Sequence, residues 1–253
     1  MADPMSSELE IHVYPDLESL SRTAAERLID RAQEAVAGHG RFSLSLAGGT
    51  TPRTLYQLLA GEYRDQIPWS RVHLFWGDER CVPPDHPDSN FAMVDEALIS
   101  KVPLPPENVH RIPTEKPVET VAEAYEQTLR EFFQPAPATS FPAFDLILLG
   151  MGEDGHTASL FPDGSALEER ERWVAPALAP PTYSSRQRIT LTLPVLNRAN
   201  DVFFLVSGAS KKTVVRAILN DPEQASRLYP AARVRPRGRV VWFLDEAARG
   251  AGA

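Results

Sequence analysis

The segment that ends at His156 combines residue types suited to proton transfer. An apolar run leads into Gly150-Met151-Gly152-Glu153-Asp154-Gly155-His156, so glycines, carboxylates and an imidazole lie close together in the chain. Glycine allows positive φ angles and close approach of a ligand, and histidine, with an unperturbed pKa of ~6.5, exchanges protons near neutral pH. The pattern predicts a catalytic loop with His156 as a general base and with Gly152 and Gly155 close to the ligand. Asp154 could either orient the imidazole or hold a substrate hydroxyl, and the sequence leaves both roles open.

Glycines and hydroxyls follow a second apolar run, in Ala47-Gly48-Gly49-Thr50-Thr51-Pro52. The glycines permit a tight turn, Thr50 and Thr51 offer hydroxyls, and Pro52 fits the first turn of a helix, whose free amides attract small anions. We therefore predict a phosphate-binding loop at residues 48–51, with an ordinary strand-to-helix turn as the structural alternative. The spacing matches neither the dinucleotide motif G-x-G-x-x-G nor a nucleotide P-loop, which argues against NAD and ATP.

Charged residues directly follow a third apolar run, in Gly77-Asp78-Glu79-Arg80. Charges at the end of a buried strand need a reason, and Asp78 and Arg80 are candidates for contact with a ligand. The structural alternative is a solvated loop, with Ser89 or Asn90 as the cap of the next helix. If His156 is not the base, Asp78 or Glu79 is the next candidate for that role.

Lysine is rare in this chain, with four lysines against 22 arginines, yet Lys211 and Lys212 stand together at an expected helix start. A cation there opposes the helix dipole at a cost of ~0.3–1 kcal/mol, which indicates that at least one of them faces an anion. Arg186 and Arg188 precede or begin a short apolar segment and are further candidates. The sequence leaves open which of Lys211, Arg188 and Arg186 is the main phosphate partner.

Alternating strands and helices are expected to position these loops. Short apolar runs rich in β-branched and aromatic residues predict buried strands, and segments with helical spacing lie between them. Such alternation is typical of an α/β fold with a mostly parallel sheet and helices on both faces, in which ligands bind at the carboxyl ends of the strands. The candidate loops should therefore meet at one edge of the sheet. The expected strands are 42–46, 72–76, 144–149, 189–193, 202–206 and 240–244, and the expected helices are 17–36, 52–59, 91–99, 118–132 and 211–219.

Composition limits the possible partners of the chain. Its 253 residues include 34 acidic and 26 basic side chains, and the net charge of -8 opposes a broad electrostatic footprint on nucleic acid or an anionic membrane. The single cysteine, Cys81, cannot form an intrachain disulfide, and no spacing of cysteine, histidine or carboxylates is typical of a metal site. Residues 1–10 lack the pattern of a signal peptide and no run is long enough for a membrane helix, so we expect a cytoplasmic location. His73, His86 and His110 are expected to be surface or structural histidines.

Taken in order, these motifs resemble the 6-phosphogluconolactonase family over nearly the whole chain. The stretch around His156 is highly specific, whereas the first and last segments are weak signals individually. Thr50 stands where many relatives have serine after the paired glycines, which preserves the hydroxyl. The matching segments are 47–53, 77–83, 86, 88–90, 149–162, 188–192 and 208–211.

The resemblance implies a single modified Rossmann-like domain, residues 1–253, related to the sugar-phosphate isomerases and deaminases. It also implies hydrolysis of 6-phospho-D-glucono-1,5-lactone to 6-phospho-D-gluconate in the oxidative branch of the pentose phosphate pathway, with no metal and no cofactor. In such an enzyme His156 would be the base on the attacking water, and Arg80 would bind or polarise the substrate. The expected partner is this small sugar-phosphate lactone, with no nucleic acid or membrane, and the expected state is a monomer or a weak oligomer.

Other functions fit parts of the same pattern. Glucosamine-6-phosphate deaminases share the implied fold and an Asp-Gly-His loop, but their histidine works with a glutamate a few residues on, and residues 157–162 here contain no carboxylate. A domain that senses sugar phosphates without turnover is an alternative of another class. Against a sensor stand the retained His156 and the lack of a DNA-binding segment with a basic face.

Overall fold

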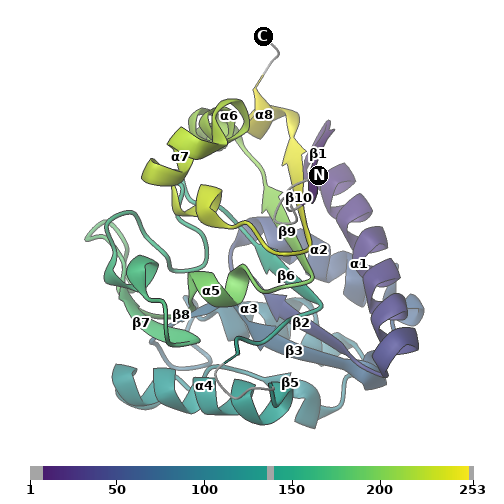
Figure 1. Ribbon diagram of the computed structural model, residues 1–253. Helices are drawn as coiled ribbons and strands as arrows, with labels where there is room; N and C mark the ends of the chain where they lie inside the picture. Colours follow the sequence, from purple (N-terminus) through teal and green to yellow (C-terminus); the bar gives the residue numbers. More distant parts are fainter. Residues whose placement is uncertain (1–7, 136–139, 251–253) are drawn as a thin grey trace, which may run out of the picture.

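A seven-stranded parallel sheet forms the centre of the computed structural model, which describes residues 8–135 and 140–250 (Figure 1). The strands lie in the order β1-β10-β9-β6-β2-β3-β5, and each neighbouring pair is parallel. The inner strands are mostly apolar and buried on both faces, as expected for a sheet between helix layers. The strands are β1 (Glu8–Tyr14), β2 (Phe42–Leu46), β3 (Val72–Trp76), β5 (Val109–His110), β6 (Leu146–Leu149), β9 (Asp201–Val206) and β10 (Arg239–Asp245).

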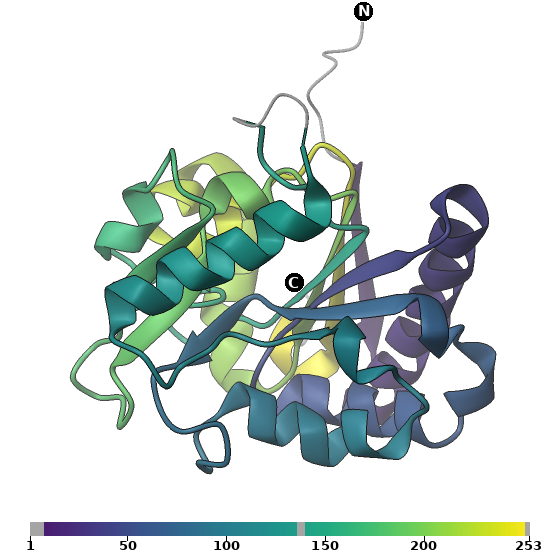
Figure 2. The same cartoon turned by 90° about the horizontal axis from the view of Figure 1, so that it is seen from below.

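Helices cover both faces of this sheet. α1, α2 and α3 pack against one another on one face, and α4, α6 and α7 lie on the other (Figures 1 and 2). The longest helix, α1, begins after Asp16, whose side chain accepts a hydrogen bond from Ser19 N, and ends at Gly40 in the left-handed region. The expected mostly parallel sheet with helices on both faces is therefore confirmed. The helices are α1 (Leu17–His39), α2 (Thr50–Ala60), α3 (Asn90–Ala97), α4 (Val118–Phe133), α5 (Leu193–Leu196), α6 (Lys212–Asn220), α7 (Pro222–Leu228) and α8 (Glu246–Arg249).

A small antiparallel sheet extends the structure beyond the end of β3. It contains β4 (Asp78–Arg80), β8 (Gln187–Leu191) and β7 (Val174–Leu178) in this order, and α4 packs against β7 and β8. The prediction of a loop at residues 77–80 is therefore wrong, and the strand expected at 189–193 lies two residues earlier than predicted. The reason is long-range pairing, because the backbone of the charged segment β4 finds its hydrogen-bond partners on β8 rather than in solvent.

The outer strands β1 and β5 were not predicted. β1 alternates exposed Leu9, Ile11 and Val13 with polar residues, and β5 has only two residues, so neither produces a continuous apolar run. Some helix ends also differ, since α2 begins at Thr50 and α6 begins at Lys212 after a short 3-10 turn. The 3-10 helices are η1 (Arg64–Gln66), η2 (Trp69–Arg71), η3 (Ile99–Lys101), η4 (Pro106–Asn108), η5 (Ser165–Glu168), η6 (Ala209–Lys211) and η7 (Pro230–Arg233).

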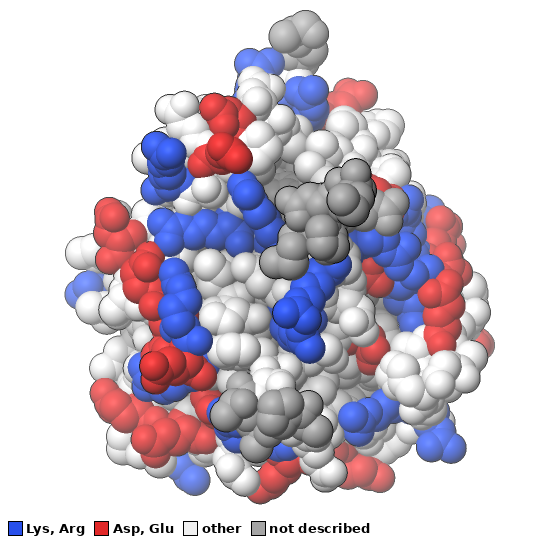
Figure 3. Space-filling view, in the orientation of Figure 1, with Lys and Arg blue, Asp and Glu red and all other residues white. Residues whose placement is uncertain are grey.

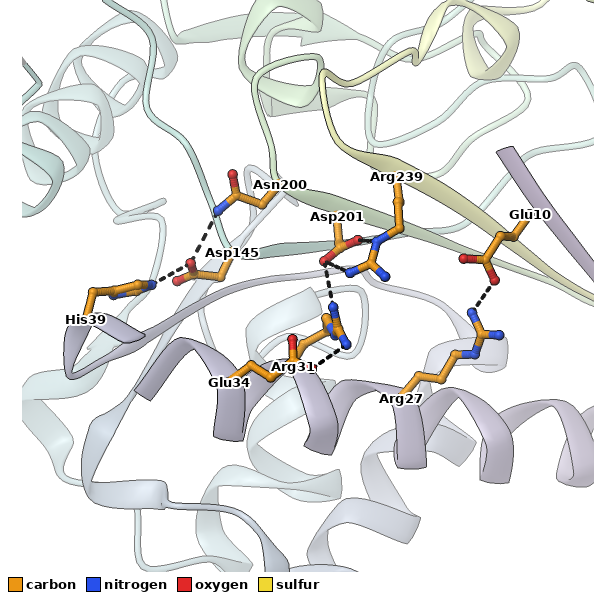
Figure 4. A network of polar contacts seen from close by, with 9 residues as sticks. All are labelled: Glu10, Arg27, Arg31, Glu34, His39, Asp145, Asn200, Asp201 and Arg239. Carbon is orange, nitrogen blue, oxygen red and sulfur yellow. Dashed lines mark hydrogen bonds and ion pairs between the residues drawn. The ribbon is translucent and has the colours of Figure 1, made fainter. Parts of the chain in front are cut away.

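Polar side chains tie α1 to the amino ends of the strands (Figure 4). Asp201, at the start of β9, accepts a hydrogen bond from Arg239 Nε at 2.8 Å and lies 4.0 Å from the Arg31 guanidinium of α1. Asp145, just before β6, lies 3.0 Å from the imidazole of His39. This network stabilises the edge of the sheet opposite the carboxyl ends, so the charged groups there have structural partners.

The buried side chains of both sheets belong to one hydrophobic core. On the face shown in Figure 3, basic and acidic side chains occur side by side. Within the described residues no helix is long and apolar enough to cross a lipid bilayer.

Candidate active site

A cavity of about 440 Å³ opens at the carboxyl ends of the central strands. Its walls come from the loops that follow β2, β3, β6 and β9, which are neighbours or near neighbours in the parallel sheet. Because parallel strands all end at the same edge, loops far apart in the sequence converge there. The prediction that the candidate loops meet at one edge is confirmed. The predicted site residues that line the cavity are Gly48, Gly49, Thr50, Thr51, Asp78, Arg80, Gly152, His156, Arg188 and Lys211.

His156 lies in this cavity with Asp154 directly behind it. Asp154 Oδ1 is 2.5 Å from His156 Nδ1 and also accepts a hydrogen bond from the His156 backbone N at 3.1 Å. Burial opposes ionisation of Asp154, but the hydrogen bond and charge attraction from His156 outweigh it and lower the pKa of the carboxyl. An ionised Asp154 accepts from Nδ1–H, which leaves Nε2 as the nitrogen able to accept a proton.

Glycines allow the tight loop that presents His156. Gly152 N donates to the His156 carbonyl oxygen at 2.8 Å, and a Cβ atom at Gly152 would lie 2.1 Å from His156 Nδ1. Gly155 has a φ of 77°, and a Cβ atom there would lie 2.6 Å from the Tyr229 ring. Neither position has room for a side chain, so the loop geometry that aims the imidazole depends on glycine. Gly155 and Asp154 support the loop without lining the cavity.

Two arginines face each other on neighbouring strands. Arg80 on β4 and Arg188 on β8 are directly opposite in the antiparallel register, and both line the cavity. Each has a buried Nε atom without a hydrogen-bond partner among the described residues. Burial lowers the pKa of Arg188, against the attraction of Asp78 and with repulsion from Arg80. Like charges opposite each other are unfavourable in a sheet, and an anion held between or beside them would offset that repulsion.

The glycine and threonine loop forms another wall with Lys211. Gly49 has a φ of 102°, and among the described residues no side chain caps the first turn of α2, so the amides of this turn have no side-chain acceptor there. Thr50 and Thr51 are the first residues of α2, and Lys211 lies in η6 at the end of the loop after β9. Together these groups make a positively polarised pocket wall of the kind that binds phosphate.

Asp78 and Glu79 differ sharply in their surroundings. Asp78 lines the cavity, and its carboxylate accepts from Ser159 Oγ at 2.6 Å and from Asn90 Nδ2 at 3.3 Å. The Glu79 carboxylate points away into the protein and accepts from the backbone N atoms of Asn90 and Phe91 at the start of α3. Burial raises the pKa of Glu79 although these amides oppose the shift. Glu79 therefore anchors α3, and its oxygens are already engaged.

The remaining sequence candidates lie outside the cavity. Arg186 Nε donates to the Ala179 carbonyl oxygen at 3.0 Å within the turn between β7 and β8. His73 and His110 contact each other across β3 and β5, at a Nδ1 to Nε2 distance of 3.2 Å. Cys81 is half-buried, and burial raises the pKa of its thiol to about 11. In the described parts of the chain no group of three or more His, Cys, Asp and Glu side chains could hold a metal ion.

Several cavity residues were missed by the sequence analysis. Tyr183 and Phe161 place aromatic rings beside His156, at centroid distances of 5.9 and 4.6 Å. Asn90 supports Asp78 and has a buried Oδ1 atom without a partner among the described residues, and Ser159 is bonded to Asp78. Asn90 and Ser159 lie inside the motif segments 88–90 and 149–162, so the sequence could have marked them as site residues. No motif in the sequence marks Tyr183, because it belongs to a proline-rich turn that only the packing of the small sheet brings to the site.

The fold and the site together define an α/β enzyme in which a histidine held by a carboxylate and several cationic groups share one cavity at the carboxyl edge of the sheet. The chain belongs to the family described as "Glucosamine-6-phosphate isomerases/6-phosphogluconolactonase", whose profile matches residues 15–242.

The alignments with curated relatives cover almost the whole chain. A protein of Nostoc sp. named 6-phosphogluconolactonase is 40% identical over 240 residues, which are 94% of this chain and 96% of that protein. A human protein with the same name is 43% identical over 242 residues, or 94% of this chain and 92% of the relative.

Solved structures show the same similarity. A 6-phosphogluconolactonase from Thermotoga maritima matches with a TM-score of 0.81 and 32% identity, over 94% of this chain and 100% of that one. The 6-phosphogluconolactonase from Trypanosoma brucei matches with a TM-score of 0.83 and 30% identity, over 96% of this chain and 98% of that one. The expected fold and family are thereby confirmed.

Proposed function

We propose that this chain hydrolyses 6-phospho-D-glucono-1,5-lactone to 6-phospho-D-gluconate, a step of the oxidative branch of the pentose phosphate pathway. The observation that carries the proposal is the His156–Asp154 pair, in which Asp154 holds an imidazole that lines the cavity, while the other cavity walls carry Arg80, Arg188 and Lys211. A base for water and cations for a phosphorylated substrate are what this reaction requires. Membership of the family and relatives named for this activity support the same reaction.

In this mechanism His156 activates the attacking water. Asp154 holds the imidazole through Nδ1, and Nε2 accepts a proton from a water molecule as its oxygen attacks the lactone carbonyl carbon. The resulting tetrahedral intermediate collapses by breaking the bond between that carbon and the ring oxygen. The ring oxygen takes the proton back from His156, so one water is added across one ester bond and the open acid is released.

The cationic groups divide between the two ends of the substrate. Arg80 is held by the Asp88 carbonyl oxygen, which accepts from its Nη1 atom at 2.7 Å, and it stabilises negative charge on the lactone carbonyl oxygen during attack. Lys211, Arg188 and the loop at residues 48–51 bind the phosphate. Asp78, already fixed by Ser159 and Asn90, accepts a hydrogen bond from a sugar hydroxyl.

The two rival functions make different predictions. After His156 the chain enters a turn at Thr157–Leu160 without a carboxylate, so a glutamate partner of the deaminase type is missing from that segment. A glucosamine-6-phosphate deaminase would release ammonia from glucosamine 6-phosphate. A sensor would show saturable binding of the sugar phosphate and would leave the rate of lactone hydrolysis unchanged.

The test is a coupled assay with lactone made in place from glucose 6-phosphate, NADP and glucose-6-phosphate dehydrogenase. Adding the protein should accelerate disappearance of the lactone well above its spontaneous hydrolysis. The same rate should persist in the presence of a chelator, because the described cavity residues offer no cluster of metal ligands. No acceleration, or loss of activity with chelator that a metal restores, contradicts this proposal.

Three finer features stay predictions. We propose that the whole chain, residues 1–253, acts as one domain, that it works as a monomer or weak oligomer, and that it is cytoplasmic. Limited proteolysis, sedimentation velocity and cell fractionation test these features in turn. A stable fragment with its own activity would contradict the single domain. A tight oligomer would contradict the monomeric or weakly associated state, and a membrane-bound fraction would contradict the cytoplasmic location.

A further inference from the structure

Tyr183 lines the cavity, near both the proposed base and one of the proposed phosphate-binding arginines. Its ring centroid is 5.9 Å from that of His156, with the two planes at 83°, and 5.8 Å from the Arg188 guanidinium carbon. It also lies 5.7 Å from the ring of Phe161. The side chain is half-buried and lines the cavity. A substrate that contacts both His156 and Arg188 would therefore lie near this ring.

The turn that carries Tyr183 is closed by hydrogen bonds of its own backbone. It joins β7 to β8 and is closed at its base, where Ala179 N donates to the Arg186 carbonyl oxygen at 2.8 Å. At its tip, Pro181, Thr182 and Ser184 are exposed. Tyr183 N also donates to the Pro180 carbonyl oxygen at 3.1 Å. Both of these hydrogen bonds lie within the turn.

The two serines that follow Tyr183 join the turn to another segment of the chain. Ser184 Oγ and Ser185 Oγ both donate to Asp88 Oδ2, at 3.0 and 2.6 Å. We name these two hydrogen bonds the serine clasp. The two hydroxyls lower the pKa of Asp88, which therefore remains an ionised acceptor near neutral pH. The clasp joins the Tyr183 turn to the segment before α3, where the Asp88 carbonyl oxygen also accepts from Arg80.

We propose that Tyr183 is a substrate-binding residue that covers the sugar ring of the bound lactone, and that the serine clasp is the positioning element that holds it over the cavity. This inference rests on the proposed function, because it assumes a sugar phosphate with its reactive carbon at His156. A flat aromatic ring offers an apolar surface to the C–H groups of a sugar and limits the entry of further water. Burial and the nearby Asp154 charge raise the pKa of Tyr183, so its hydroxyl keeps its proton.

The first test removes the ring. Tyr183→Ala should raise KM for the lactone about 3- to 10-fold, the range expected for loss of one aromatic contact. Tyr183→Phe keeps the ring and should stay within about 2-fold of the unchanged protein, because the contact is chiefly with the ring face. A large effect of Tyr183→Phe would assign the binding to the hydroxyl and overturn the ring contact.

The second test removes the clasp. The Ser184→Ala, Ser185→Ala double variant should raise KM in the same way as Tyr183→Ala, with a smaller change in kcat, since His156 and Asp154 keep their own contacts. Ser185→Thr retains a hydroxyl and should restore most of the affinity in a Ser184→Ala background. Ser100→Ala is the matched control, because it removes an exposed hydroxyl that donates to the Asp95 carbonyl oxygen at 2.8 Å away from the cavity, and it should leave KM unchanged.

A double-mutant cycle decides whether the serines act through Tyr183. If they do, removing the clasp in the Tyr183→Ala background should add nothing further to KM. Equal effects of clasp removal with and without the tyrosine would mean that the clasp merely stabilises the turn, and this would overturn its positioning role. Thermal unfolding of each variant checks that all remain folded at the assay temperature.

Binding of the product, 6-phosphogluconate, gives a readout that does not need turnover. Calorimetric Kd values for the same variants should follow the KM pattern. If the unchanged protein fails to hydrolyse lactone but Tyr183→Ala still weakens binding, the proposed function is wrong and the role of Tyr183 in binding holds. If hydrolysis is present and Tyr183→Ala leaves both KM and Kd unchanged, the inference is wrong. A protein that neither hydrolyses lactone nor binds 6-phosphogluconate contradicts both proposals.

Discussion

At the residue scale, the contact between Asp154 and His156 determines which imidazole nitrogen is available to react. An acceptor on Nδ1 keeps the proton of the neutral ring there, and Nε2 is then free to accept a proton. In the proposed mechanism the same contact would stabilise the charged imidazolium that forms once water has given up its proton. Substitutions of His156 and of Asp154 should therefore reduce the rate by different amounts.

His156→Asn should reduce kcat by about 10²- to 10⁴-fold, the usual value of a positioned base, and should change KM much less. Asp154→Asn should cause a smaller loss, because the imidazole remains but its orientation is no longer enforced. Steady-state kinetics corrected for spontaneous lactone hydrolysis measures both. A folded His156→Asn protein with near-normal kcat would transfer the role of base to Asp78, since Glu79 is engaged with the amides of α3.

Substitutions of the proposed phosphate-binding residues should change KM more than kcat. If Lys211 and Arg188 bind the phosphate as proposed, Lys211→Ala and Arg188→Ala each remove a charged contact to the non-reacting end of the substrate. Each should then raise KM about 10- to 100-fold with a smaller effect on kcat. Lys212→Ala is the matched control, because it removes the same charge at the next position, which does not line the cavity. An unchanged KM in both site variants would leave the phosphate with Thr50, Thr51 and the first turn of α2.

At the scale of elements, the loop after β6 packs against Tyr229 and η7. Ala231 N donates to the Gly155 carbonyl oxygen at 2.9 Å, and the Tyr229 ring fills the space beside Gly155. His156 is the next residue, so a shift at this contact moves the imidazole directly. The position of the His156 imidazole thus depends partly on Tyr229 and η7, which contribute no charged group to the cavity lining.

Gly155→Ala should lower the free energy of unfolding by about 1–3 kcal/mol, because alanine is strained at this positive φ, and it should also lower kcat. The added Cβ atom would lie 2.6 Å from the Tyr229 ring, which forces the loop or the ring to move. Urea unfolding and kinetics on the same sample measure both effects. Gly38→Ala is the control, since nothing lies within 4 Å of its added Cβ atom, and it should change stability by less than about 1 kcal/mol. Equal behaviour of the two variants would contradict the role assigned to the loop.

At the scale of the whole molecule, two histidines on β3 and β5, at one end of the strand order, should make the free energy of unfolding depend on pH. His110 stacks on Phe75 at a centroid distance of 4.4 Å and contacts His73. Burial, with a further contribution from His73, lowers the pKa of His110 to about 4. Burial and the Arg41 charge also lower the pKa of His73. Both rings are therefore neutral in the folded protein at a pH where they are protonated in the unfolded chain.

The free energy of unfolding should consequently fall as pH decreases from about 6.5, the pKa of an unfolded histidine, towards about 4. In this window the unfolded chain binds more protons than the folded one, which favours unfolding. His110→Phe retains an aromatic ring on Phe75 and should flatten the dependence. Urea unfolding at several pH values between these limits measures the slope, and an identical slope in both proteins would assign the acid sensitivity to other groups.

The sequence by itself determined the alternation of strands and helices, the glycine loops and the candidate base. These features are local, because an apolar run predicts a strand and glycine beside a carboxylate and an imidazole predicts a functional turn. The bounds of β2 and β3 matched their apolar runs for this reason. The convergence of loops also followed from the sequence, since parallel strands joined by helices must end at one edge.

Only the tertiary structure decided what surrounds His156. β4 became a strand because its partner, β8, is supplied by a distant part of the chain, and that pairing brings Arg80 opposite Arg188. The same packing engaged Glu79 with α3 and brought Tyr183 to the cavity wall. No local pattern encodes such contacts, because their energy arises only when segments far apart in the chain pack together and remove polar groups from water.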